Sequence, residues 1–121
     1  VCYLMEEYYF LGKITMNWFN SMFSSTPATP IEGDVLLIDV RSPEEFASGY
    51  VEGAINVPLP ILPLRFQEIA PDTARQIVVY CRSGARSGMA QQFLKERNYA
   101  NVINGGSVDS TAVLVKRAVV R

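Results

Sequence analysis

The sequence contains no histidine, and this absence excludes several classes of enzyme. A Ser-His-Asp triad and a Cys-His dyad both need an imidazole as general base, so proteases of those two types are excluded. Zinc sites built from cysteine and histidine are excluded too, because two cysteines alone cannot close a four-ligand site. We therefore predict no bound metal.

Cysteine is also scarce, with only Cys2 and Cys81 in the chain. Two cysteines do not make the disulfide framework of a small secreted domain. They stand far apart in segments of different character, which favours a reducing compartment. We expect a cytoplasmic protein, with membrane association or export through the N-terminal segment as the alternative.

Net charge is almost absent as well: the 121 residues carry a formal charge of −1, which gives no general reason to expect nucleic acid as a partner. The charges are unevenly placed: the charged residues of 1–80 are mainly acidic, and those of 81–121 are mainly basic. Folding either mixes the two halves or leaves a basic patch near Cys81 that attracts a small anion. Nearly half of the residues are apolar, enough for the core of one domain.

Long apolar runs are missing from the aromatic N-terminal segment, because Glu6, Glu7 and Lys13 interrupt it. Residues 14–23 place their large apolar side chains on one helical face, which predicts an amphipathic helix. That helix would dock on its own domain, contact a membrane surface or mediate self-association.

Residues 24–30 contain two prolines among small polar residues and are typical of a linker. The sequence therefore predicts an N-terminal segment over residues 1–30 and a compact domain over residues 31–121. Met16 is a second possible start of the natural chain.

From residue 31 onward, strand and helix signals alternate, which predicts an α/β fold with a mainly parallel central sheet and helices on both faces. Ser42-Pro43-Glu44-Glu45 has the pattern of a helix start, with a capping serine, proline next and glutamate at the third helical position. The expected strands are 35–40, 54–57, 76–80 and 101–103, and the expected helices are 43–48, part of 59–70, 85–98 and 110–119.

Cys81 follows the strongest strand signal and opens a short loop that leads into a helix. Ligands of open α/β sheets bind at the carboxyl ends of the strands, where this loop lies. Backbone N–H groups, the helix N-terminus, Arg82 and Arg86 would all favour the thiolate form of Cys81. Gly84 lets the backbone turn. The segment predicts a nucleophilic cysteine, with a buried structural cysteine as the alternative.

At this point the sequence resembles the rhodanese-like domain family. The resemblance covers roughly residues 31–106 and rests on four segments in order: Leu37–Phe46, Gly49–Pro58, Tyr80–Ser87 and Asn104–Gly106. It implies a sulfurtransferase in which Cys81 takes a sulfur atom from a small anionic donor such as thiosulfate, becomes a persulfide and passes the sulfur to cyanide or a thiol. A protein is a further possible acceptor, and no cofactor is needed.

The resemblance also implies roles for neighbouring residues. The loop would cradle the persulfide, the two arginines would bind the donor or shape the loop, and two first-motif residues would brace the site. These residues are Arg82, Ser83, Gly84, Ala85, Arg86 and Ser87 in the loop, and Asp39 and Arg41 as the brace.

Two departures from the family pattern are visible. Tyr50 stands where the family usually has histidine, so this position supplies no catalytic base here. Residues 107–112 lack the tryptophan that the family often has shortly after its Gly-Gly turn.

Two other functions compete with sulfur transfer. A cysteine-dependent phosphatase or arsenate reductase needs an arginine after five intervening residues, but here Arg86 follows after four and Ser87 occupies the clamp position. The other candidate is a rhodanese-like module that docks or relays sulfur with a protein partner. Such modules often lack the cysteine, which this chain keeps.

Overall fold

The computed structural model describes residues 34–121. Several sequence predictions lie outside this range: the amphipathic helix over 14–23, the linker over 24–30, the start at Met16 and the domain start near Ile31.

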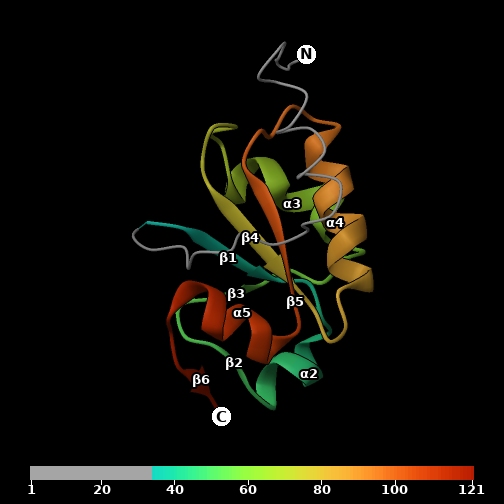
Figure 1. The fold of residues 1–121 in the computed structure, drawn as a ribbon. Helices are drawn as coiled ribbons and strands as arrows, with labels where there is room; N and C mark the ends of the chain where they lie inside the picture. Colours follow the sequence, from blue (N-terminus) through green and yellow to red (C-terminus); the bar gives the residue numbers. More distant parts are fainter. Residues whose placement is uncertain (1–33) are drawn as a thin grey trace.

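The described residues alternate between strands and helices (Figure 1). None of these helices is long and apolar enough to cross a membrane. In chain order the elements are β1 (Leu36–Asp39), α2 (Pro43–Ala47), β2 (Tyr50–Val51), β3 (Ile55–Asn56), α3 (Leu62–Ile69), β4 (Ile77–Tyr80), α4 (Ala85–Lys95), β5 (Val102–Gly106), α5 (Val108–Val115) and β6 (Val119–Val120).

The central sheet has four strands in the order β3-β1-β4-β5, and all of its pairs are parallel. β4 lies between β1 and β5, and all four of its residues are fully buried. A strand covered on both faces needs a continuous apolar sequence, which explains the Ile-Val-Val-Tyr run. The predicted fold class is confirmed.

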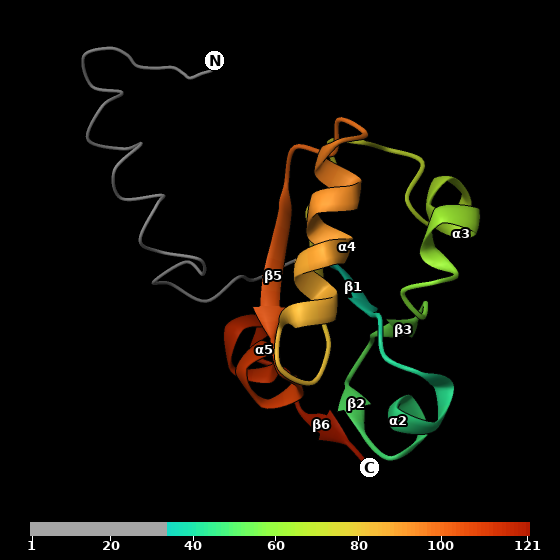
Figure 2. The same cartoon turned by 90° about the vertical axis from the view of Figure 1, so that its right-hand side faces the viewer.

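Successive side chains of β4 point to opposite faces of the sheet and enter two separate cores. Ile77 and Val79 pack in the core under α3 and α4, whereas Val78 and Tyr80 pack in the core under α5. Figure 2 shows α3 and α4 on one side of the sheet and α5 on the other. Cys81 continues the alternation and belongs to the α3–α4 face.

The predicted start of the first helix is confirmed. The Ser42 hydroxyl accepts a hydrogen bond from the Glu45 N–H, and the Glu45 carboxylate accepts one from the Ser42 N–H. Such a capping box satisfies two N–H groups that a helix start leaves without partners. Glu45 is thereby held in place at the beginning of α2.

The C-terminal region differs from the sequence prediction. Ser107 caps a helix that begins at Val108 rather than 110, and Lys116 ends it in a left-handed conformation with φ 58°. The expected helix end at 119 instead forms β6, which pairs antiparallel with β2. Both strands have two residues, too few to show a periodic pattern.

β5 is also longer than expected, because it continues through the Gly105-Gly106 pair. A Cβ at position 105 would collide with the Thr111 hydroxyl of α5 and lie 3.1 Å from a Val78 methyl group. Glycine at 105 therefore lets α5 pack closely on the sheet, beside the strand end where Cys81 lies.

Candidate active site

Cys81 lies directly after β4, where the chain leaves the sheet. Its N–H donates to the Gly106 carbonyl at 2.9 Å, so the backbone is still paired with β5 at this residue. The residue has no exposed surface. A second molecule can therefore reach the Cys81 sulfur only when neighbouring atoms of the loop are displaced.

The loop after Cys81 turns back over the sulfur. Gly84 has φ 99°, a left-handed conformation that favours glycine, and it is the residue from which α4 starts. This turn directs the Gly84 N–H at the Cys81 Sγ, at a distance of 3.0 Å. One backbone N–H of the loop thus points at the sulfur, as the predicted cup requires.

Ser87 and Asn104 complete the surroundings of the sulfur. The Ser87 Oγ lies 3.4 Å from the Cys81 Sγ and 2.6 Å from the Asn104 Oδ1. The Asn104 Nδ2 donates to the Gly84 carbonyl at 3.0 Å. Sequence reasoning included Asn104 only as part of a turn. A polar residue at the end of an apolar strand, just before two glycines, was the one local signal of a special position.

These contacts determine the acidity of the thiol. Burial by itself would raise the pKa of Cys81, because the charged form loses its hydration. Hydrogen bonds from the Ser87 hydroxyl and from the backbone N–H groups of Ser87, Gly84 and Ser83 outweigh burial and lower the pKa to about 7. A large part of the cysteine is therefore thiolate at neutral pH.

The two arginines of the loop have different surroundings. Arg86 binds Glu45 of α2 through two hydrogen bonds, at 2.8 and 3.1 Å. Arg82 is exposed and forms no hydrogen bond or ion pair with the described part of the chain. Of the two side chains, Arg82 is the one whose charge is available to an incoming anion.

Asp39 and Arg41 form a buried ion pair at the end of β1, beside the end of β4. The Arg41 guanidinium binds both carboxylate oxygens of Asp39 at 2.6 to 3.0 Å and also donates to the Gly49 carbonyl. Asn56 donates to the carbonyls of Asp39 and Arg41, at 3.0 and 2.9 Å. The pair thus joins the ends of β1 and β3 to the turn before β2, which is the arrangement of a structural brace.

Tyr50, at the position of the missing family histidine, stacks on Phe46 of α2 with ring centroids 4.2 Å apart. Its ring thus packs against a helix.

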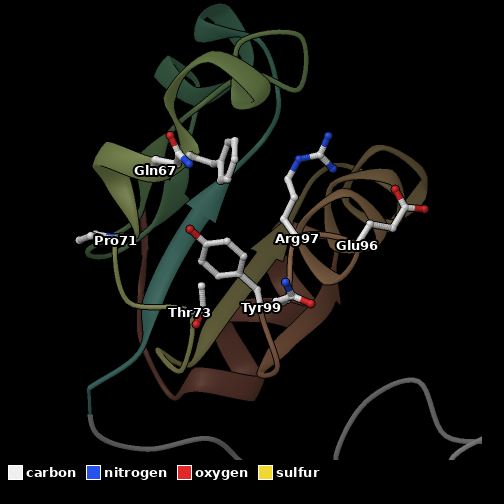
Figure 3. A pocket seen from close by; sticks show the side chains of 8 residues that line it. Gln67, Pro71, Thr73, Glu96, Arg97 and Tyr99 are labelled. Atoms are coloured by element: carbon white, nitrogen blue, oxygen red, sulfur yellow. The ribbon is translucent and has the colours of Figure 1, made fainter.

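A surface hollow of about 590 Å³ lies at the opposite end of α4 (Figure 3). The figure shows the Tyr99 ring below Gln67 and Arg97 and close to Thr73. The helix that separates this hollow from the Cys81 loop is roughly 16 Å long. Its main polar groups already have partners: the Tyr99 hydroxyl donates to the Ala70 carbonyl, and the Arg97 guanidinium lies 3.6 Å from the centre of the Phe93 ring. The hollow is separate from the cysteine site.

The site is thus a buried cysteine at the end of a central parallel strand, with the N–H of the following loop directed at its sulfur. A sequence model of the rhodanese-like domain matches residues 17–109. The chain therefore belongs to the rhodanese-like domain family.

Individual proteins agree with this assignment. A sulfurtransferase of Allochromatium vinosum is 45% identical over 71 residues, which cover 59% of this chain and 64% of that protein. The thiosulfate sulfurtransferase PspE of Escherichia coli is 40% identical over 76 residues, or 63% of this chain and 73% of that protein. The solved structure of a rhodanese with anions from E. coli has a TM-score of 0.65 and 34% identity, and covers 73% of this chain and 99% of that one.

The Arg86–Glu45 pair leads to a prediction about stability in acid. The hydrogen bonds from Arg86, followed by that from the Ser42 N–H, lower the pKa of Glu45 from 4.5 to about 2. Because the pKa of Glu45 is lower in the folded state, its ionised carboxylate stabilises the fold fully above pH 4.5, and this stabilisation is lost as the pH falls toward 2. We expect Glu45→Gln to destabilise the fold at about pH 6 and to have a smaller effect at about pH 3, as measured by urea unfolding.

Glu68→Gln is the matched control, because Glu68 pairs with Arg65 on the exposed surface of α3. Its effect should be small at both pH values. An effect of Glu45→Gln that is the same at both pH values would contradict the role given to the pair.

Proposed function

We propose that this chain is a sulfurtransferase that carries a sulfur atom as a Cys81 persulfide from a small anionic donor, such as thiosulfate, to cyanide or a thiol. The observation that carries the proposal is the 3.0 Å contact from the Gly84 N–H to the Cys81 Sγ, with the cysteine fully buried. The names of the relatives, a sulfurtransferase and a thiosulfate sulfurtransferase, support the same chemistry.

The reaction needs only a thiolate and a place for negative charge. The Cys81 thiolate attacks the outer sulfur of thiosulfate, a new S–S bond forms, and the S–S bond of the donor breaks. Sulfite leaves with the electron pair of that bond. The acceptor, as cyanide or a thiolate, then attacks the outer sulfur and returns Cys81 to the thiolate. No proton transfer or added oxidant is required, which suits a site without histidine.

Negative charge stays at the sulfur, or on the groups attached to it, through both steps. The Gly84 N–H points at the Cys81 sulfur, and the Ser87 hydroxyl lies beside it. The Gly84 N–H is held by the backbone, and a fixed donor of this kind stabilises a developing anion without reorganisation of solvent. A protein thiol also meets the chemical requirement for an acceptor, so a sulfur relay uses the same site.

Arg82 and Arg86 divide the remaining work in this proposal. Arg82 attracts and binds the anionic donor, since its guanidinium is exposed and has no partner among residues 34–121. Arg86 shapes the loop through Glu45. The engagement of Arg86 with Glu45 also disfavours phosphate ester chemistry, which needs a free arginine clamp over the phosphate oxygens.

Mass spectrometry of the reduced protein after incubation with thiosulfate tests the persulfide. We expect the mass of one sulfur atom to be added in a Cys2→Ser variant, and to be lost again on treatment with cyanide. The Cys2→Ser/Cys81→Ser double variant should gain nothing. If Cys81 stays unmodified with thiosulfate and other small donors, the small-molecule reaction is wrong, and the chain is a docking module or a relay that requires a protein donor.

Steady-state kinetics test the role of Arg82. We expect Arg82→Ala to raise KM for thiosulfate about five-fold, which corresponds to about 1 kcal/mol for a partly screened charge contact, with little change in kcat. The effect should shrink at high salt. Arg97→Ala removes an equal charge at the far end of α4 and should leave KM unchanged. Equal effects of the two substitutions would show that Arg82 acts only through net charge.

A further inference from the structure

The Ser87 hydroxyl faces two acceptors but carries one proton. Its oxygen lies 2.6 Å from the Asn104 Oδ1 and 3.4 Å from the Cys81 Sγ, and Ser87 is completely buried. With the sulfur as a thiolate, both neighbours can only accept a hydrogen bond. Ser87 can satisfy one of them at a time.

The orientation of the Asn104 amide is determined by two backbone groups. The Gly106 N–H donates to the Oδ1 at 3.0 Å, and the Nδ2 donates to the Gly84 carbonyl at 3.0 Å. A flipped amide would put a donor against an N–H and an acceptor against a carbonyl, so it is excluded. The atom that faces Ser87 is therefore an oxygen, and the Ser87 proton lies in the short contact with it.

With the proton in this place, a lone pair of the Ser87 oxygen faces the sulfur. That arrangement suits the neutral thiol, whose S–H donates to Ser87. It does not suit the thiolate, which is stabilised when the Ser87 O–H donates to the sulfur. Ionisation of Cys81 thus requires the Ser87 O–H to turn from one neighbour to the other.

We propose that Asn104 is a positioning residue that competes with the Cys81 thiolate for the Ser87 hydroxyl proton. When the thiol gives its proton to solvent, the Ser87 O–H rotates from the Asn104 Oδ1 to the Cys81 Sγ, and the Ser87 proton stays on its oxygen. The Asn104 Oδ1 still accepts from the Gly106 N–H, so it is not left without a partner.

The competition deepens the proposed function, and its bearing on transfer rests on that function. A sulfur carrier must be a good nucleophile when it takes the sulfur and a good leaving group when it releases it. These demands oppose each other, and the best compromise is a thiol whose pKa lies near the ambient pH. Asn104 keeps the thiolate from being overstabilised by the hydroxyl, while its Nδ2 holds the loop that supplies the other donors.

The charges around Cys81 must stay constant in any test. They belong to Arg82 and Arg86 on the loop and α4, Glu45 on α2, and the Asp39–Arg41 pair at the end of β1. β5 has no charged side chain. Substitutions at Ser87 and Asn104 leave all of these in place.

A double-mutant cycle on the pKa of Cys81 separates the competition from simple support of the loop. The thiolate absorbance in the far ultraviolet is titrated in the Cys2→Ser background and in the same background with Ser87→Ala, with Asn104→Ala and with both. Loosening of the loop raises the pKa in either background. The freed hydroxyl lowers it only where Ser87 is present. The Asn104→Ala shift should therefore be more negative with Ser87 in place than in the Ser87→Ala background, by about half a pH unit or more.

Gln91→Ala is the matched control, because its side-chain amide also joins α4 to β5, through the Val102 carbonyl, away from the sulfur. It should leave the pKa of Cys81 unchanged and show no dependence on Ser87. Additive shifts from Ser87→Ala and Asn104→Ala, or a coupling of opposite sign, would overturn the proposal. The titration uses no sulfur donor, so its outcome is independent of whether thiosulfate is a substrate.

If Asn104→Ala does not fold, NMR gives the same answer without an Asn104 variant. The side-chain NH₂ signals of Asn104 should shift with the ionisation of Cys81 when Ser87 is present. They should shift much less in Ser87→Ala. Equal shifts in the two proteins would overturn the competition, because they would report only the charge of the sulfur.

Discussion

The hydrogen bond from the Gly84 N–H to the Cys81 sulfur meets a requirement on which the rest of the site depends, namely that a buried thiolate needs hydrogen-bond donors around it. A thiolate is buried at a strand end, and the chain has no histidine to pair with it. Burial disfavours the charge, so donors must be held around the sulfur by the backbone. The left-handed Gly84 and the start of α4 supply them.

The rest of the structure holds this loop from two sides. On the α2 side, Arg86 binds a glutamate that also caps its own helix. On the β5 side, the Asn104 amide binds Gly84, and the Gly106 carbonyl accepts from the Cys81 N–H. On the neighbouring strand, the Asp39–Arg41 pair ties β1 to the turn before β2. Each contact joins segments whose positions are otherwise set by the sheet. The backbone donors therefore stay in place when the charge on the sulfur changes, and only the Ser87 O–H rotates.

Much of this fold was predictable because its signals are local. The apolar run of β4 and the Ser42 cap depend on residues close together in the chain. The Cys81 loop was recognisable for the same reason. The pairing of Arg86 with Glu45 was not, because 41 residues separate them in the sequence. Asn104 is separated from Ser87 by 17 residues, and only the parallel pairing of β4 with β5 brings it to the loop. The β2–β6 ribbon was missed because two-residue strands carry no pattern.

Titration of the Cys81 thiol measures whether backbone and hydroxyl donors outweigh the burial of the sulfur. The thiolate absorbance of a Cys2→Ser protein is followed against pH, with the Cys2→Ser/Cys81→Ser protein as the blank. We expect a midpoint at about 7. A midpoint at or above the ordinary cysteine value of 9.0 would contradict it, because burial would then dominate and the loop would not be a site for negative charge.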